Sequence, residues 1–586
     1  MCSIIGYIGP RQAAPLLVDG LKRMEYRGYD SAGVATLTAT GIRVRKGVGK
    51  VAEVNYSQRL DTLPGNVGIG HTRWATHGGV TDANAHPHSS SSNEIAIVHN
   101  GIIDNFLELK EELSSIGYSF KSDTDSEVIA NLLQKNFDDT SDLKKAMIST
   151  LTQLKGKYAF IAILADGSVA AARFHEPLII GVGKDSYFIS SDIMGFVNST
   201  DEVIYLDDSE FAIIRQKELS ICDFQGNPTK HLLTKVSKEF SDVGKSDYVH
   251  YTLKEIYEQP MTISRAGATT QLELEWVAEV LKKPRKVYIT GSGTSFNAAL
   301  VGKYLFSKYA KINVEPIVSS ETQFSPVYFD SSSLLIALSQ SGESADVLET
   351  VSMAKSSGAE VVSIVNVMTS TLARITSIAI GLNCGPEIGV AATKSFTSQI
   401  AILYNLADRC SNGRLHLDFE AVSEHISRIL LEQPGIKEIA RLVKGISDIY
   451  VLGKGIHYFM AMEASLKLKE LPYIHAESLP GGELKHGPLA LLDSNTYVVA
   501  INPRDSTYDS MAATTHEVKA RGAKIIGISN APSPNYDYWI AIPSMDEALY
   551  PLVEMIPIQL LAYYSALERN ANPDYPRNLA KSVTVK

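Results

Sequence analysis

The stretch KVYITGSGTS, residues 286–295, decides the fold of the second half of the chain. Strand-forming side chains run into a glycine-rich turn, and a helical pattern follows at once. The same order begins again at residues 334–338, and residues 361–365 form a third apolar run. This alternation of strands and helices predicts a parallel, doubly wound sheet, which binds ligands at the carboxyl ends of its strands.

The module occurs twice. The run DIYVLGKG, residues 448–455, repeats the opening strand and glycine turn about 160 residues later. The loop SQSGES, residues 339–344, is rich in hydroxyls, whereas the second copy has NPRDS at residues 502–506. Hydroxyls and free N–H groups at a helix N-terminus suit a phosphate dianion, while Pro503 lacks a donor and Asp505 adds negative charge. We expect one phosphate site, in the first copy; the alternative is that these serines only cap a helix.

Residues 1–235 have a different pattern, in which short β-rich runs dominate and amphipathic helical patterns are few. We expect strands at residues 4–8, 33–38, 67–70, 94–98, 160–164, 178–181 and 203–206, and helices at 105–116 and 126–135. Strands in this number with helices between them predict two stacked sheets with helical layers outside.

Cys2 stands where removal of Met1 would make it the N-terminal residue. One residue would then carry a thiol nucleophile and an α-amine with a pKa of roughly 8, which could take the thiol proton near neutral pH. The alternative is a small apolar residue that leads a buried strand.

The loops expected between these strands carry further polar residues. Arg73 and Asp125 could bind the carboxylate and the amine of an amino acid. The Asn100 side chain and the Gly101 N–H could stabilise an oxyanion. Taken singly, the first pair could equally be surface charges and the second an ordinary hairpin turn.

A histidine-rich stretch raises the question of a metal. Its members match no zinc-binding spacing and no cysteine joins them, so we expect no metal site; they are His71, His77, His86, His88 and His99.

Glu463, Lys467 and Glu470 share one helix face through spacings of four and three. Carboxylates beside a lysine, with His486 soon after, could move protons on a sugar carbon. A solvated ladder of ion pairs is the alternative. Spacing nominates no role for Lys581, which lies in what would ordinarily be a frayed tail.

The length, the net charge and the number of cysteines limit the class of protein. The length of 586 residues suggests three or four domains, and the net charge of -10 argues against a nucleic-acid or anionic-membrane partner. Four widely separated cysteines fit neither a disulfide framework nor a zinc knuckle, and no targeting or membrane-spanning segment is visible. We expect a cytoplasmic protein.

The first half resembles the class II glutamine amidotransferases, which have an N-terminal nucleophile fold with αββα layers. The motifs that carry the resemblance are Cys2 and residues 25–33, 71–78, 84–88, 99–102 and 124–125. It implies that Cys2 attacks the glutamine carboxamide and that Asn100 and Gly101 form the oxyanion hole. It also implies a glutamine site of Arg73, Thr76, His77 and Asp125, and an ammonia channel lined by Trp74 and Arg27. Ser3 departs from the glycine usual in the family.

The second half resembles the paired sugar isomerase (SIS) domains of the glucosamine-6-phosphate synthase family. The matching motifs are residues 293–295, 338–343, 387–391, 466–470, 475–477, 483–488 and 578–585. The resemblance implies catalytic roles for Lys467, Glu470, His486 from a neighbouring subunit, and Lys581 as an imine-forming amine. It implies that the sugar phosphate is bound by Ser295, Ser339, Gln340, Ser341, Ser344, Val390, Ala391 and Glu463. Ser292, Ser344 and Ala392 differ from many relatives.

The resemblance covers essentially the whole chain. It implies an amidotransferase domain at 1–235, a linker at 236–260, SIS domains at 277–416 and 440–576, and a catalytic tail at 577–586. The implied reaction moves the amide nitrogen of L-glutamine to D-fructose 6-phosphate, isomerises the product to D-glucosamine 6-phosphate and releases L-glutamate, as the first step of amino-sugar (UDP-N-acetylglucosamine) biosynthesis. No metal or organic cofactor is implied, and the acceptor site would be shared in a homodimer. A glutaminase fused to a sugar-phosphate-binding regulator, or an enzyme for another ketose phosphate, are the rivals.

Overall fold

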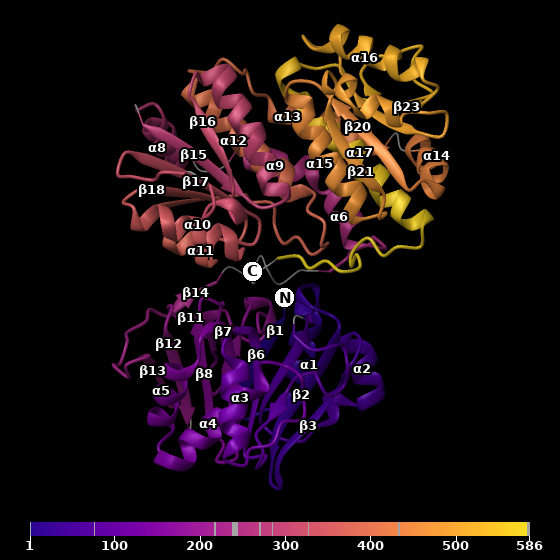
Figure 1. The fold of residues 1–586 in the computed structure, drawn as a ribbon. Coiled ribbons are helices and arrows are strands. Elements are labelled where there is room, and N and C mark those ends of the chain that lie inside the picture. The colour runs from indigo at the N-terminus through magenta and orange to yellow at the C-terminus, as the bar shows by residue number, and fades with distance from the viewer. Residues whose placement is uncertain are drawn as a thin grey trace. The chain divides into compact units, whose positions relative to one another are not determined.

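The computed structural model describes residues 2–75, 77–215, 218–236, 244–268, 271–283, 285–325, 327–431 and 434–582. The chain divides into two compact units (Figure 1). Unit 1 comprises Met1–Val243 with Ser582–Lys586, and unit 2 comprises Gly244–Lys581. Within the described ranges, no helix combines the length and the apolar character needed to cross a bilayer.

Unit 1 contains two antiparallel sheets. The eight-stranded sheet has the order β14-β11-β9-β10-β1-β4-β2-β3, and the six-stranded sheet has the order β13-β12-β8-β7-β6-β5. The larger sheet consists of β1 (Ser3–Ile8), β2 (Ser31–Thr38), β3 (Gly41–Val48), β4 (Val67–Arg73), β9 (Ile179–Val182), β10 (Tyr187–Ser190), β11 (Glu202–Tyr205) and β14 (Thr234–Lys235). The smaller consists of β5 (His88–Ser89), β6 (Ile95–Ile103), β7 (Gly156–Leu164), β8 (Val169–Phe174), β12 (Glu210–Arg215) and β13 (Glu218–Asp223).

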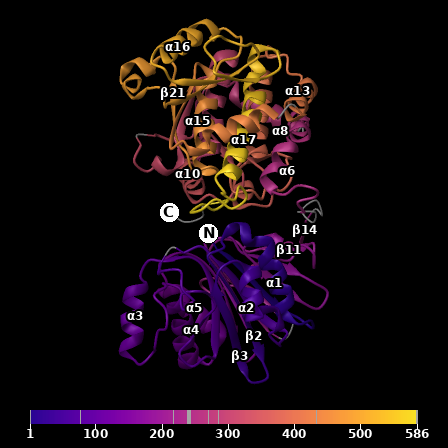
Figure 2. The ribbon, with the colours of Figure 1, turned by 90° about the vertical axis from the view of Figure 1, so that its right-hand side faces the viewer.

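Alternation along β1 explains how the layers of unit 1 pack. Ile4 packs between the two sheets with Ile161 of β7, whereas its neighbour Ile5 packs under a helix with Leu17. The helices on the larger sheet are α1 (Ala13–Met24) and α2 (Val51–Gln58); those on the smaller are α3 (Phe106–Ser115), α4 (Glu127–Thr140) and α5 (Leu143–Gln153) (Figure 2). The predicted αββα arrangement is confirmed.

Each strand expected in unit 1 coincides with an observed one. The pattern missed strands such as β3 and β8, because RVRK at residues 43–46 is mostly charged and the alanine run at 170–172 lacks the large β-branched side chains that mark a strand.

Unit 2 contains two parallel sheets of five strands each. Their orders are β16-β15-β17-β18-β19 and β21-β20-β22-β23-β24, so both copies follow one topology. The first consists of β15 (Lys286–Gly291), β16 (Val314–Val318), β17 (Ser333–Ser339), β18 (Glu360–Val365) and β19 (Ile378–Gly381). The second consists of β20 (Asp448–Gly453), β21 (His475–Pro480), β22 (Tyr497–Ile501), β23 (Lys524–Ser529) and β24 (Tyr538–Ala541). The predicted repeat of a doubly wound sheet is confirmed.

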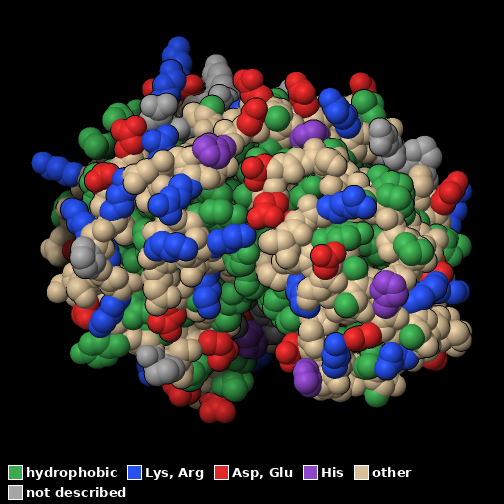
Figure 3. Space-filling view, turned by 90° about the horizontal axis from the view of Figure 1, so that it is seen from above, with side chains coloured by type: hydrophobic (Ala, Val, Ile, Leu, Met, Phe, Trp, Pro, Cys, Tyr) green, Lys and Arg blue, Asp and Glu red, His purple; other side chains and the backbone are tan. Residues whose placement is uncertain are grey.

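The helices of unit 2 join the two sheets through a single core. This core includes Ala298, Phe396, Met460 and Tyr563 from four different helices. The helices are α6 (Tyr251–Tyr257), α7 (Gln259–Gly267), α8 (Gln271–Leu281), α9 (Thr294–Leu305), α10 (Ala345–Ser356), α11 (Thr371–Ile375), α12 (Lys394–Cys410), α13 (Phe419–Leu431), α14 (Pro434–Leu442), α15 (Ile456–Glu470), α16 (Tyr508–Ala520) and α17 (Tyr550–Glu568). On the face seen in Figure 3, hydrophobic side chains show between two lobes, and neither sign of charge dominates.

Glycines fix the turn from the first strand to the first helix in each copy. Gly293 and Gly455, which precede α9 and α15, have φ angles of 54° and 58°. A Cβ atom on Gly453 would lie 2.2 Å from the carbonyl oxygen of His457. The helix can approach the strand this closely only because residue 453 has no side chain.

We predict that Gly453→Ala lowers the free energy of unfolding by about 1 to 3 kcal/mol, because the helix must move away from the strand. Urea unfolding of the whole chain measures this. Gly482→Ala is the control, since a Cβ there meets no atom within 4 Å and the backbone is already helical, with φ of −72°. Equal stability of the two variants would contradict the prediction.

Candidate active site

Cys2 directly precedes β1, and the pairing of Ser3 with Thr72 places it beside the end of β4. Its Sγ accepts a hydrogen bond from the Trp74 N–H at 3.2 Å. Burial raises the pKa of the Cys2 thiol, although the Trp74 N–H and the charge of Arg73 act in the opposite direction. The resting group is therefore the thiol, and a nearby base is needed to activate it.

Ser3, which departs from the family pattern, fits without crowding the turn. It is fully buried and its hydroxyl donates to the Met24 carbonyl at 3.0 Å. The extra polar group is thus satisfied within the fold.

Arg73 ends β4 and is buried, with its guanidinium donating to the carbonyls of His77, Gly78 and Gly79. Burial lowers the pKa of Arg73, and nearby groups that include Asp30 and Asp125 act in the opposite direction. Asp125 is also buried and accepts from the Ile103 N–H at 2.8 Å. These two charges are not ordinary surface charges, so that alternative is wrong.

Asn100 and Gly101 were expected in a loop, with a hairpin turn as the alternative, and both expectations are wrong. They lie inside β6, opposite Ala159 and Tyr158 of β7. Gly101 has a φ of 110°, and a Cβ there would lie 2.0 Å from the Lys157 carbonyl oxygen. Asn100 is buried, and its Oδ1 has no hydrogen-bond partner among the described residues. The Asn100 Oδ1 therefore makes no hydrogen bond that stabilises the described fold.

A hydrogen bond between the sheets brings these groups to one end of unit 1. The His71 Nε2 on β4 donates to the His99 carbonyl of β6 at 2.9 Å. Arg73 lies two residues beyond His71, and Asn100 follows His99. The sheets therefore bring Cys2, Arg73 and Asn100 to the same end of unit 1, and the loop before α4 adds Asp125, which accepts from the Ile103 N–H of β6.

The remaining predicted residues of unit 1 belong to the ammonia channel and the glutamine site. The Trp74 ring contacts Tyr29 edge-on at 5.8 Å, and buried Arg27 pairs with Asp192 at 3.0 Å. His77 contributes a backbone carbonyl to Arg73. Thr76 lies outside the described residues.

Three of the histidines considered as metal ligands, His71, His86 and His88, pack against one another in the interior. The His71 and His86 rings stack at 3.9 Å, and burial lowers the pKa of His71 to about 3. Among the described residues, the group with ligand atoms mutually within 4.8 Å is instead Asp207, Glu210 and His231.

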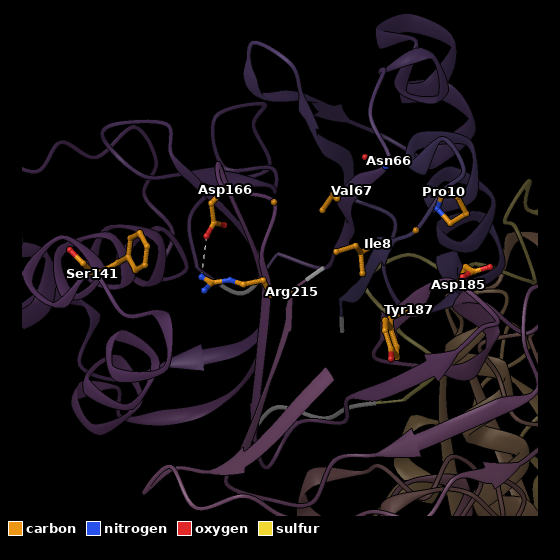
Figure 4. Close-up of a pocket in the computed structure, with 12 residues that line it drawn as sticks. Ile8, Pro10, Asn66, Val67, Ser141, Asp166, Asp185, Tyr187 and Arg215 are labelled. Atoms are coloured by element: carbon orange, nitrogen blue, oxygen red, sulfur yellow. Dashed lines mark hydrogen bonds and ion pairs between the residues drawn. The ribbon is translucent and has the colours of Figure 1, made fainter. Parts of the chain in front are cut away.

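A cavity of about 680 Å³ lies near Ile8, at the opposite end of β1 from Cys2 (Figure 4). Its lining includes the ion pair of Asp166 and Arg215, whose atoms are 3.1 Å apart. No predicted site residue lines it, so it is distinct from the candidate active site.

In unit 2, the first turn of α9 binds the acidic cluster of α15. Thr294 Oγ1 donates to Glu463 Oε1 at 3.0 Å, and Asn297 Nδ2 donates to Glu463 Oε2 at 2.7 Å. Lys467 Nζ lies 3.4 Å from Glu463 Oε1 and also pairs with Glu470. The side chains of Glu463 and Lys467 are 0% exposed, so the solvated ion-pair ladder is wrong.

Burial and charge act in opposite directions within this cluster. Burial raises the pKa of Glu463 despite the charge of Lys467. Burial alone would lower the pKa of Lys467, but Glu470 and Glu463 outweigh it and the pKa is raised. Lys467 therefore stays charged, and Glu470, whose side chain is 20% exposed, is the accessible carboxylate.

Lys581 is held inside the fold rather than in a frayed tail. Its Nζ donates to Glu387 Oε2 at 2.5 Å and to the Gly389 carbonyl at 2.7 Å. Burial raises the pKa of the Glu387 carboxyl, but Lys581 and backbone donors outweigh it and the pKa falls to about 2. The pair is thus ionic at neutral pH.

Hydrogen bonds connect Lys581 to the first turn of α9. Ser395 of α12 donates to Glu387 at 2.7 Å. One turn further along α12, Gln399 Nε2 donates to Ser295 Oγ at 2.9 Å. Ser295 neighbours Thr294, which binds Glu463. The tail lysine, the predicted phosphate serine and the acidic cluster therefore surround one helix end.

The predicted phosphate loop begins at the carboxyl end of β17, next to β15 in the sheet. Ser339 and Ser341 accept from the N–H groups of Gly342 and Glu343 at 2.9 and 3.2 Å. Ser344 immediately precedes α10 without capping it through its side chain. The Asn366 N–H donates to the Gln340 carbonyl at 3.3 Å, and its side chain donates to the Gly385 carbonyl at 2.8 Å.

Val390 and Ala391 are buried in the loop that follows the Lys581 partners. The Val390 N–H donates to the Asp574 carbonyl at 3.2 Å. Asp574 Oδ1 accepts from the Thr252 N–H at 2.8 Å, and Oδ2 pairs with Lys245 at 3.3 Å. The tail that carries Lys581 is thereby fastened to the segment that leads into α6.

The chain does not bring His486 into this cluster. His486 is exposed at the end of the 3-10 helix η8 (Glu483–His486), and no described contact ties it to Lys467 or Glu470.

The sequence singled out no role for several residues that hold the site together: Thr294, Asn297, Glu387, Ser395 and Gln399. The one available signal was a buried polar run, SFTSQ at residues 395–399, at the start of an apolar helix. Such runs indicate paired polar groups but do not name their partners.

Comparison with known proteins identifies the family. The glutamine amidotransferase domain profile matches residues 71–198, and the SIS domain profile matches residues 280–409 and 444–569. A glutamine–fructose-6-phosphate aminotransferase (isomerizing) from Pyrococcus horikoshii is 44% identical over the full length of both chains, and one from Thermococcus kodakarensis is 42% identical. The chain belongs to the glutamine–fructose-6-phosphate aminotransferase (isomerizing) family.

Solved structures agree for the second half. A C-terminal domain of glucosamine-fructose-6-phosphate aminotransferase from Francisella tularensis is 35% identical, with a TM-score of 0.52 over 57% of this chain and all of that chain. A putative tagatose-6-phosphate ketose/aldose isomerase from Clostridium novyi NT shares the fold at 23% identity, with a TM-score of 0.51 over 57% of this chain and 93% of that chain.

We predict that Lys467→Met lowers the free energy of unfolding by about 3 to 5 kcal/mol, because it leaves Glu463 and Glu470 without their cation. Lys469→Met, on the exposed side of α15, is the matched control and should change little. Urea unfolding compares the two. A Lys467 variant as stable as the control would mean that the buried pair contributes no net stability.

Proposed function

We propose that this chain transfers the amide nitrogen of L-glutamine to D-fructose 6-phosphate, forms D-glucosamine 6-phosphate and releases L-glutamate. One observation carries the acceptor half of the proposal. Lys581, Ser295 and the cluster of Glu463, Lys467 and Glu470 are tied to a single helix end. An amine, a hydroxyl pocket and an accessible carboxylate are the groups that amination and isomerisation of a ketose phosphate require.

In unit 1, Cys2 would attack the glutamine carboxamide after removal of Met1. The freed α-amine would take the thiol proton, which buried Cys2 otherwise retains. Asn100 and Gly101 would stabilise the oxyanion, and their place in a strand supports this because a rigid donor loses little energy on reorganising. Arg73 and Asp125, with Thr76 and His77, would hold the α-groups of glutamine.

In unit 2, the phosphate of the ketose would bind at Ser295, Ser339, Gln340, Ser341 and Ser344, close to the N-termini of α9 and α10. Val390, Ala391 and Glu463 would contact the sugar. Because buried Glu463 already accepts two hydrogen bonds from α9, it positions its neighbours as well.

Lys581 would form an imine at C2 of the open-chain sugar, and the C2 carbonyl oxygen would leave as water. Its Nζ is paired with Glu387, and only an amine with a free lone pair can attack the carbonyl carbon, so this contact must open first. Ammonia then displaces the lysine, and Glu470 would move a proton between C1 and C2 while Lys467 stabilises the charge on the sugar oxygen.

Ammonia must pass from one reaction to the other away from water, which would protonate it to an ammonium ion that is not nucleophilic. We propose that Trp74 and Arg27 line its path. We also propose a cytoplasmic homodimer in which His486 of the neighbouring subunit assists ring opening. The exposure of His486 in the single chain supports this shared site. The mechanism needs no metal or organic cofactor.

Incubation of the protein with glutamine and fructose 6-phosphate tests the function. Glucosamine 6-phosphate and glutamate are expected in equal amounts. Glutamate release without an amino sugar would favour a glutaminase fused to a binding domain, and activity only with another ketose phosphate would change the acceptor. Mass spectrometry of the N-terminus checks that Met1 has been removed.

We predict that two variants separate the halves. Cys2→Ala should abolish use of glutamine and keep isomerisation of the sugar phosphate. Lys581→Ala should keep glutamine hydrolysis and lose amino-sugar formation. Glutamate and sugar products are measured in the same samples, and circular dichroism checks the fold. Loss of both activities in a folded variant would contradict the division of labour.

A further inference from the structure

The two sheets of unit 2 allow a comparison between corresponding residues. In each copy the first strand leads through a glycine of positive φ into a helix, α9 or α15. Ser295 is the second residue of α9, and His457 is the second residue of α15. The two side chains therefore occupy corresponding places at the carboxyl edge of their sheets.

The partners of these two residues also correspond. Ser295 accepts from Gln399, near the start of the last helix of its copy, α12. His457 Nδ1 lies 2.7 Å from Glu554 Oε1, near the start of the last helix of the second copy, α17. The loop after the third strand of the first copy, β17, is the serine loop, and the loop after the third strand of the second copy, β22, supplies Asp505, whose Oδ2 lies 2.9 Å from His457 Nε2.

The second copy thus carries an internal anion where the first is open to a phosphate. Asp505 is held in place by the N–H and hydroxyl of Thr507, at 2.8 and 2.7 Å. The side chains of His457 and Glu554 are 0% exposed, and that of Asp505 is 7% exposed. Both carboxylates raise the pKa of His457, and together they outweigh burial. A charged imidazolium between two carboxylates gives each buried charge a counter-ion, through a hydrogen bond to Asp505 and an ion pair with Glu554.

This ion triad sits at the start of the helix that carries Glu463, Lys467 and Glu470. Six residues, about 9 Å of helix, separate His457 from Glu463. Apolar side chains of α15 lie on all of its faces, so burial alone does not fix the rotation of the helix about its axis. Directional contacts must do so. They include the hydrogen bonds of Glu463 and Lys467 to α9 and the hydrogen bond of His457 to Asp505.

We propose that His457 is a positioning residue for the sugar reaction. Clamped by Asp505 and Glu554, it sets the rotation of α15 and thereby aims Glu470 and Lys467 at the bound sugar. The expected change in kcat rests on the proposed function, whereas the expected role of His457 in fixing the rotation of α15 does not.

The test compares His457→Gln with His475→Gln in the full-length protein. His475 makes a similar contact with Asp448, at 2.8 Å, but on the surface, with 72% of its side chain exposed. In the His457 variant, kcat for amino-sugar formation should fall about 10- to 100-fold, while KM for fructose 6-phosphate and the rate of glutamine hydrolysis stay unchanged. The His475 variant should resemble the wild type in all three.

A second variant distinguishes loss of the positioning contact from destabilisation by unpaired buried charge. His457→Gln leaves two buried carboxylates facing each other, and adding Glu554→Gln removes one of them. The double variant should recover part of the lost kcat. Hydrogen exchange of the backbone amides at residues 463–470 should be faster in His457→Gln than in His475→Gln, and slower again in the double variant.

The outcomes distinguish the two proposals. Wild-type protein that makes no amino sugar overturns the proposed function, and the exchange measurement still decides the inference. Unchanged exchange at residues 463–470, or an unchanged kcat in an active enzyme, overturns the inference. A rise in KM for fructose 6-phosphate with kcat unchanged also overturns it, because His457 would then act in binding.

Discussion

The contact between α9 and α15 is the interaction on which the second half of this molecule depends. The Glu463 side chain is fully buried and relies on Thr294, Asn297 and Lys467. A buried carboxylate with these partners is stable only while two helices from different copies of the repeat keep their positions. The same turn of α9 presents Ser295 to α12 and, through it, connects to Lys581. The positions of the Lys581 amine and of the acidic cluster therefore both depend on the first turn of α9.

Repetition of a fold does not require repetition of its chemistry. Both sheets have the same strand order and the same glycine turn. The first keeps a hydroxyl-lined loop, while the second places Asp505 against His457. In the proposed function, one copy holds the ligand while the other stabilises the helix that acts on it. The two copies share one continuous core.

Much of the architecture was predictable because it depends on local patterns. Strand periodicity and glycine turns identified both folds, and the amidotransferase and SIS resemblances followed from motifs. Contacts between distant residues were less accessible. The Asn-Gly pair at residues 100–101 has the composition of a turn, yet pairing with β7 extends the strand through it. The spacing of Glu463 and Lys467 fits a solvated ladder equally well, and only the packing of α9 shows that they are buried. Glu387 has no periodic signal, because its partner Lys581 lies almost 200 residues away.

Asp574 joins the beginning and the end of unit 2. Its carboxylate holds the Thr252 N–H and Lys245, where the chain enters unit 2, and it lies seven residues before Lys581, where the chain leaves. A single side chain thus closes unit 2 into a loop, with its entrance and its exit fastened together. A fragment cut at these two points would keep both ends side by side, so the unit could be excised, permuted or inserted into another protein with little rearrangement.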